Sequence, residues 1–124
     1  MGRALAVAIG GACGALMRYW MVIWINQLFG RGFPYSTLTV NVLGAFLLGV
    51  VHTVTDRGLE LSQEVRMGIL MGGLGAFTTF SAFSSETLGL LDQGRFVAAS
   101  LNVFLNVVLC VTACWAGFAL GRSG

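Results

Sequence analysis

Residues 72–84 hold the densest set of polar groups in an otherwise apolar part of the chain. The run reads Gly-Gly-Leu-Gly-Ala-Phe-Thr-Thr-Phe-Ser-Ala-Phe-Ser, with three glycines, four hydroxyl side chains and three phenylalanines. No Asp, Glu, Lys or Arg occurs between Met67 and Ser85, so the chemistry on offer is hydrogen bonding rather than acid–base catalysis. Loose backbone at membrane depth is tolerated only where it lines a protein cavity or water. We therefore expect a polar species to be handled in the middle of a membrane.

Phe80 and Phe83 lie one helical turn apart, directly after the glycine-rich stretch. Phenyl rings in a membrane helix usually face lipid or pack against neighbours. A ring is also negative on its face and positive at its edge, so that an edge can solvate a small anion. Donors without a fixed opposing cation let an anion bind and leave, as conduction requires. The hydroxyl donors beside the rings belong to Thr78, Thr79, Ser81 and Ser84.

Polar side chains also interrupt the other apolar segments. Arg18 either reaches the interface with its long side chain or concentrates anions at a pore mouth. Asn41 either hydrogen-bonds a neighbouring helix or offers two N–H donors to an anion. Asn102 and Asn106, one turn apart, share a helix face and raise the same question. Glu86 is interpreted as a helix-end or interfacial charge rather than a catalytic acid.

The elements that position these residues are predicted to be membrane helices. Of the 124 residues, 56% are hydrophobic and 10% charged, and the mean hydropathy is +0.84. A soluble domain carries about 25% charged residues, and a helical span needs about 20 apolar residues. The uncharged windows predict an all-α membrane protein, with one four-helix transmembrane domain over residues 1–124 and helices at about 4–29, 37–54, 63–90 and 96–120.

The charges and small residues concern orientation and assembly. A net charge of +2 is too small and dispersed for a nucleic-acid partner. One side of the membrane would carry four arginines and the other two, a weak bias that permits insertion in both orientations. Small residues recur at helical spacing, as at Gly10 and Gly14, and allow close helix contact. We expect a second copy to cover some of these faces.

Three segments, in order, resemble the Fluc (CrcB) family of fluoride ion channels. Residues 14–20 read Gly-Ala-Leu-Met-Arg-Tyr-Trp, residues 37–41 read Thr-Leu-Thr-Val-Asn, and residues 78–84 read Thr-Thr-Phe-Ser-Ala-Phe-Ser. The last is close to the family's Thr-Thr-Phe-Ser-Thr-Phe signature. The likeness covers essentially the whole chain.

The resemblance implies a passive, highly selective channel that exports cytoplasmic fluoride across a bacterial inner membrane. It implies an antiparallel, dual-topology homodimer with two pores and a broken third helix. The partners are then a second copy, the lipid bilayer and fluoride. A structural sodium ion would lie at the dimer centre, held by backbone carbonyls that match Gly75 and Thr78.

Site residues follow from the same resemblance. Ring edges of Phe80 and Phe83 and the amide of Asn41 would line the fluoride pathway, and Arg18 would lie in the vestibule. The hydroxyl track along the pore would consist of Ser81, Ser84, Thr79 and Thr39.

Two departures from the family pattern bear on this expectation. Ala82 stands where the signature has Thr, which removes one hydroxyl from the track. Asn102 and Asn106 stand where smaller or hydroxyl-bearing residues are expected, and the resemblance gives them no role.

Other functional classes fit the sequence less well. A small multidrug-type proton-coupled transporter also has four short helices, but it needs a carboxylate deep in its first helix, where this chain has only Arg18. A scaffold that merely packs through glycine faces would leave the clustered donors and aromatics unexplained. No catalytic constellation supports an enzyme.

Overall fold

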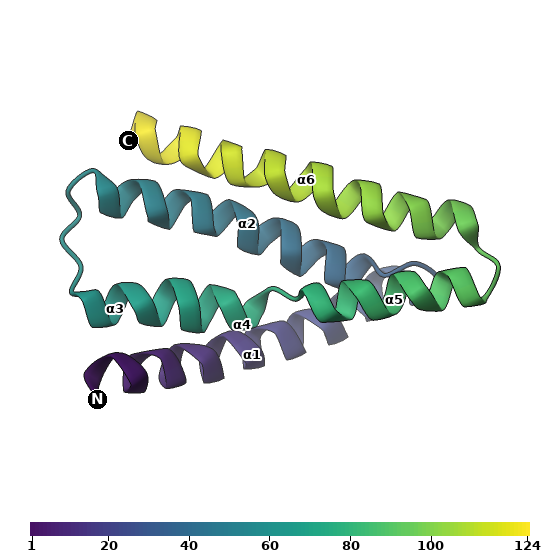
Figure 1. Ribbon diagram of the computed structural model, residues 1–124, viewed down its shortest axis with the longest axis horizontal. Coiled ribbons are helices and arrows are strands. Elements are labelled where there is room, and N and C mark those ends of the chain that lie inside the picture. Colours follow the sequence, from purple (N-terminus) through teal and green to yellow (C-terminus); the bar gives the residue numbers. More distant parts are fainter.

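The computed structural model describes residues 1–124 and is entirely helical apart from short connections (Figure 1). Four helices are long and apolar enough to cross a membrane, which confirms the all-helical prediction. The elements are α1 (Gly2–Phe29), α2 (Tyr35–Asp56), α3 (Gln63–Met67), η1 (Gly68–Leu74), α4 (Gly75–Phe77), α5 (Phe80–Asp92) and α6 (Phe96–Ser123). The helix ends lie close to those expected, although α2 begins at Tyr35 rather than at residue 37 and α6 ends at Ser123 rather than at residue 120.

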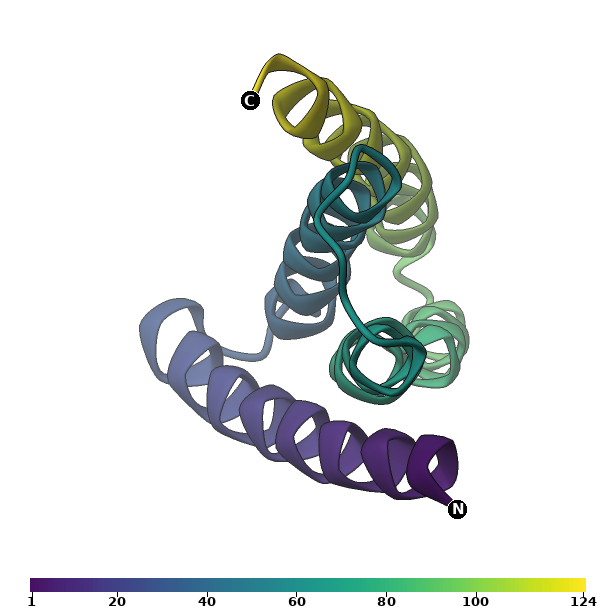
Figure 2. The same ribbon diagram turned by 90° about the vertical axis from the view of Figure 1, so that its left-hand side faces the viewer.

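The helices run back and forth along one long axis. Both termini and the α2–α3 connection lie at one end, and the α1–α2 and α5–α6 connections lie at the other (Figure 1). Seen from that first end, α2 runs beside α6, whereas α1 lies along the helices of the third span (Figure 2). The arrangement is open rather than a closed bundle, so much of each helix has no partner within the chain.

Glycines bring the helix backbones into contact, as expected from their spacing. A Cβ atom on Gly10 or Gly14 would collide with the carbonyl oxygen of Gly68 or Gly73, respectively, across the α1–η1 interface. On the other side of the molecule, a Cβ on Gly117 of α6 would collide with a carbonyl oxygen of α2. Small residues thus permit the close backbone approach on which helix association in lipid depends.

Polar contacts join the helix ends where the termini lie. The guanidinium of Arg57, just after α2, donates to the carbonyl oxygens of Gly121, at 3.1 Å, and of Arg122. Arg66 in α3 lies 3.3 Å from the carboxylate of Asp56 at the end of α2. The Arg57 contacts satisfy carbonyls at the last turn of α6, which would otherwise lack intrahelical partners.

The third span has a non-helical interruption after its glycines. Residues 68–74 form wide π-helical turns, and one further helical turn ends at Phe77. Thr78, with ψ 161°, and Thr79, with φ −153° and ψ 121°, are extended, and α5 begins at Phe80. The glycine-rich run is therefore helical, and the two threonines carry the non-helical backbone. The Thr79 hydroxyl caps α5 by accepting from the Ala82 N–H at 3.1 Å.

The chain buries very little of its apolar surface by itself. Only 18 of the 124 residues are buried, and six of these are hydrophobic core residues. Large apolar side chains remain exposed on every long helix, including Trp20, Leu48, Phe80 and Phe104. A water-soluble monomer rarely exposes so much contiguous apolar surface. With the hydropathy of its helices, this identifies a multi-pass membrane protein.

Candidate functional site

A hollow of about 460 Å³ beside the interruption brings most of the expected site residues together. We call it the central hollow. Asn41 reaches it from α2 and Asn106 from α6, and the third span supplies the rest of its polar wall. Its lining includes Asn41, Gly75, Thr78, Thr79, Phe80, Phe83 and Asn106. The extended backbone at Thr78 and Thr79 therefore borders a cavity, the setting in which non-helical backbone is tolerated within a membrane.

The two expected phenylalanines touch each other in the central hollow but differ sharply in burial. Their ring centroids lie 5.4 Å apart with an interplanar angle of 58°, a tilted arrangement. Phe83 is 9% exposed, whereas Phe80 is 77% exposed and projects from the surface of the chain. A tilted pair presents ring edges rather than two parallel faces, and edges carry the positive end of the ring quadrupole.

Asn41 makes a two-point contact with the extended backbone. Its Oδ1 accepts from the Thr79 N–H at 2.8 Å, and its Nδ2 donates to the Thr79 carbonyl at 3.0 Å. The second N–H of the amide donates to Asn106 Oδ1 at 3.1 Å. Both donors of Asn41 are thus already paired within the chain, in agreement with the neighbour-bonding alternative for this residue.

Asn41 and the Thr79 hydroxyl together deprive two backbone carbonyls of their helical donors. In a continuous helix, the Gly75 carbonyl would accept from the Thr79 N–H and the Thr78 carbonyl from the Ala82 N–H. Here the Thr79 N–H donates to Asn41, and the Ala82 N–H donates to the Thr79 hydroxyl. Both carbonyls therefore lose their usual helical donors. No group of three His, Cys, Asp or Glu side chains could hold a metal ion.

A second, more polar hollow of about 650 Å³ lies toward the end of the molecule that holds the α1–α2 and α5–α6 connections. We call it the vestibule hollow. Arg18, Arg31 and Arg95 line it, together with Thr79 and Ala82. Thr79 also lines the central hollow, so the two spaces meet at this residue. From the sequence, only Arg18 was expected in this region. Arg31 and Arg95, in the connections between helices, join Arg18 in the lining of the hollow through folding. Arg95 donates to the Gly32 carbonyl at 2.5 Å.

Glu86 also lines the vestibule hollow, which the sequence interpretation missed. Its Oε1 accepts from the Thr37 hydroxyl at 2.7 Å, while its Oε2 is buried without a hydrogen-bond partner. Glu86 lies one helical turn after Phe83, and this spacing could have placed it near the site. The hollow thus combines three arginines with one carboxylate.

The other expected hydroxyls lie outside both hollows in the single chain. Thr39 donates to the Tyr35 carbonyl at 2.7 Å, and Ser84 donates to the Phe80 carbonyl at 3.0 Å. Ser81 lies with its hydroxyl oxygen 3.3 Å from that of Thr79. Ser81 and Ser84 are exposed on α5, as Phe80 is. A single chain therefore does not assemble a continuous hydroxyl track.

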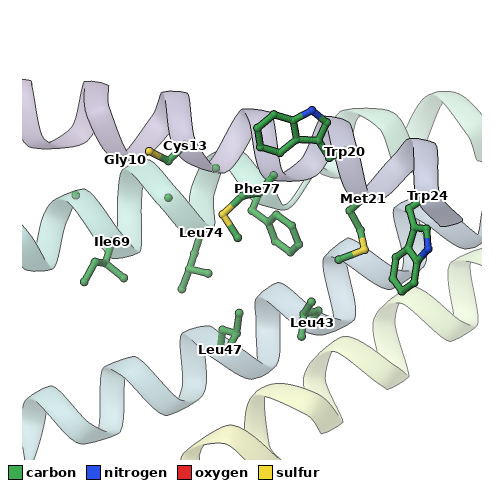
Figure 3. Close-up of a pocket in the computed structure, with 14 residues that line it drawn as sticks. Gly10, Cys13, Trp20, Met21, Trp24, Leu43, Leu47, Ile69, Leu74 and Phe77 are labelled. Carbon is green, nitrogen blue, oxygen red and sulfur yellow. The ribbon is translucent and has the colours of Figure 1, made fainter.

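A third hollow, of about 560 Å³, is almost entirely apolar. It lies between α1, α2 and the third span, where Met21, Leu43, Leu47 and Phe77 surround a common space (Figure 3). Its lining exposes almost no polar surface to an anion.

Residues 5–118 match the family model described as CrcB-like protein, Camphor Resistance (CrcB). The chain belongs to the CrcB family. A fluoride-specific ion channel FluC of Geobacter sulfurreducens is 48% identical over 122 residues, 98% of each chain. Relatives with the same name from Geobacter metallireducens and Shewanella amazonensis are 46% and 50% identical, over 95% and 94% of each chain. These comparisons confirm the family to which the three sequence segments pointed.

Proposed function

We propose that this CrcB protein is a passive, selective fluoride channel that lets fluoride leave the cytoplasm. The observation that supports this most is the central hollow, in which Phe80, Phe83 and Thr79 gather in a chain whose close relatives are named fluoride-specific ion channels. No formally charged side chain lines the central hollow. An uncharged lining binds an anion weakly enough to release it.

Hydration is the obstacle that this lining overcomes. A bare charge at the bilayer centre costs at least about 2.5 kcal/mol, and the pathway must replace the lost water. Ring edges of Phe80 and Phe83 and the Thr79, Ser81, Ser84 and Thr39 hydroxyls are the proposed replacements. Asn41 would line the pathway while its own N–H donors hold the Thr79 carbonyl and Asn106. The three arginines of the vestibule hollow would raise the local concentration of anions. Arg18 is the one of them that lies within a membrane-spanning helix. A negative-inside potential supplies about 2.3 kcal/mol per charge per 100 mV, so export needs no fuel.

The functional unit we propose is an antiparallel homodimer with two pores. Phe80 is exposed in the single chain, and the two serines of the proposed track on the same helix are exposed as well. A partner chain that covers these residues would enclose the pathway. The weak arginine bias supports insertion in both orientations, as an antiparallel pair in a bacterial inner membrane requires.

A structural sodium ion would fit the interruption of the third span. The carbonyls of Gly75 and Thr78, freed by the contacts of Asn41 and Thr79, would hold it together with their counterparts in the second chain. Carbonyl oxygens freed inside a membrane need a cation or donors. The ion would join the two chains electrostatically, while this chain's own role is to keep the break open.

Fluoride efflux from liposomes tests this function. Purified protein, reconstituted in vesicles loaded with potassium fluoride, should release fluoride to an electrode as soon as valinomycin lets potassium follow. Release should not change when an uncoupler collapses the proton gradient. Efflux that requires a proton gradient would contradict a channel and indicate a proton-coupled transporter. The α1 helix contains no Asp or Glu to carry protons for such a transporter.

A further inference from the structure

An unbroken series of hydrogen bonds runs from the interruption across three helices. From Asn41, the series passes to Asn106 Oδ1 at 3.1 Å. Asn106 Nδ2 donates to the backbone carbonyl and to Oδ1 of Asn102, at 2.8 and 3.0 Å. Asn102 Nδ2 donates to the Thr87 hydroxyl at 2.9 Å, which donates to the Phe83 carbonyl at 2.7 Å. We call the side chains of Asn41, Asn106, Asn102 and Thr87 the amide ladder.

Backbone groups along the amide ladder fix the direction of every bond in it. The Thr79 N–H can only donate, so Oδ1 of Asn41 must face it and Nδ2 must point onward. Nδ2 of Asn41 then requires an acceptor, which sets the amide of Asn106. The Asn102 carbonyl can only accept, and this demands the same orientation of Asn106. The two backbone constraints agree, so the amide ladder has one consistent hydrogen-bond polarity.

The amide ladder is also shielded from competing partners. Asn102 is 0% exposed and Asn106 6% exposed, although both lie in an apolar helix. A buried polar group left without a partner is costly. If Asn106 released Asn41, its buried amide would lose a hydrogen-bond partner that water could not replace. This cost keeps the α6 side chains bonded to Asn41.

We propose that Asn102 and Asn106 are positioning residues that, through Asn41, hold the Thr79 peptide extended and so place Phe80 and Phe83. The inference rests on the proposed function for its transport consequence. It gives the two asparagines a task in the pore without direct contact with the ion. It also explains why the helix cannot close at Thr79, since Asn41 takes the N–H that closure would need.

Side-chain substitutions on α6 and α5 test this role. Asn106→Leu keeps the approximate volume but leaves one Asn41 donor unpaired. Thr87→Val removes the hydroxyl at the far end of the amide ladder, while Thr87→Ser retains it. Thr112→Val changes an exposed threonine of the same helix outside the amide ladder and serves as the control. Each variant is reconstituted for fluoride efflux and, in detergent, analysed by hydrogen–deuterium exchange of fragments over residues 77–83.

The expected result is local and graded. Asn106→Leu should speed exchange near Thr79 and slow fluoride efflux, each by about tenfold, which corresponds to loss of one buried hydrogen bond. Thr87→Val should change both in the same direction but less, Thr87→Ser should resemble the parent, and Thr112→Val should change neither. If Asn106→Leu does not fold, the Thr87 pair decides.

Three results would overturn the proposal. Unchanged exchange and efflux would show that the amide ladder does not hold the peptide. Slower efflux with unchanged exchange would place Asn106 in direct contact with the ion instead. Faster exchange in all four spans alike would reduce its role to general stability. Because exchange needs no ion transport, a parent protein that does not conduct fluoride would refute the proposed function while leaving the positioning test intact.

Discussion

At the scale of single residues, the two phenylalanines of the signature occupy different environments. Phe83 is enclosed by its own chain, whereas Phe80 is exposed on the surface, with its ring tilted against that of Phe83. Their donors are ring hydrogens, which no aliphatic side chain supplies with the same charge distribution. The proposed pathway depends on this difference between rings and aliphatic groups rather than on hydrophobicity.

Replacing either ring by isoleucine should therefore abolish most fluoride transport. Phe80→Ile and Phe83→Ile keep the apolar character but remove the positive ring edge. We expect efflux to fall by about tenfold or more, equivalent to about 1.4 kcal/mol of lost anion stabilisation. Leu88→Ile, on an exposed position of the same helix, is the control. Parental efflux in both phenylalanine variants would remove the rings from the pathway.

Ala82 permits the opposite experiment, a gain of function. Its side chain lines the vestibule hollow beside Thr79 and Arg18, and it stands where the family signature has Thr. Ala82→Thr would add a hydroxyl donor to the wall of the vestibule hollow. We expect faster fluoride efflux, with Ala82→Val as the control for size alone. An equal increase with valine would attribute the effect to shape and not to the hydroxyl.

At the scale of elements, glycines fix how close the helices lie and hydroxyls fix where the third span stops. Gly14 packs on the Gly73 backbone, whereas a Cβ atom added to Gly11 of the same helix would meet no other atom within 4 Å. Gly14→Ala should therefore lower the melting temperature in detergent, with a loss of about 1 to 3 kcal/mol from overpacking. Gly11→Ala should not. Similar melting for both variants would contradict the close α1–η1 packing.

The elements also show what sequence could and could not predict. Apolar windows are long and uncharged, so they fix four spans to within a few residues. The position of the interruption is harder, because glycines that look loose in sequence are held helical by their contact with α1. Thr78 and Thr79 leave the helix because Asn41 takes the Thr79 N–H, a contact between residues 38 positions apart. No local sequence pattern predicts that partner.

The candidate site follows the same rule. The signature residues around Thr79 are contiguous, and sequence grouped them with Asn41. The depth of Phe83, the outward serines and the approach of Glu86 to Thr37 depend on how α2, α5 and α6 meet. Asn102 and Asn106 were predicted to share one face of a helix, and they do, but their partners lie on other helices. The spacing of residues in the sequence predicts which side chains share a helix face, but not which residues of other helices that face contacts.

At the scale of the whole molecule, the open arrangement of the helices leaves the proposed pathway incomplete. Apolar side chains, an apolar hollow and the exposed ring of Phe80 all remain on the outside of a single chain. Both termini lie at one end of the molecule, and the α1–α2 and α5–α6 connections lie at the other (Figure 1). In a chain inserted in the opposite orientation, these two ends would lie on exchanged sides of the membrane. An antiparallel pair would place equivalent vestibules on both sides.

Orientation therefore becomes an experimental handle on assembly. Glu60→Lys with Ser123→Lys adds two lysines and removes one carboxylate at the end that already holds most of the arginines. This stronger bias should force one orientation and lower fluoride efflux, because antiparallel partners are then missing. Co-expression with Arg3→Gln/Arg66→Gln/Arg122→Gln, which leaves one arginine at that end against two at the other and so reverses the bias, should restore efflux. Protease access to a C-terminal tag reports the orientation, and full activity of a uniformly oriented protein would contradict the antiparallel dimer.

The central claim is that uncharged donors beside an interrupted helix replace the water around a small halide. Parallel measurement of fluoride and chloride release from the same proteoliposomes tests it most directly. Fluoride should leave within the mixing time of the electrode after valinomycin is added, while chloride stays inside. Chloride release at a comparable rate would show a general anion leak and would contradict selective replacement of fluoride's hydration shell.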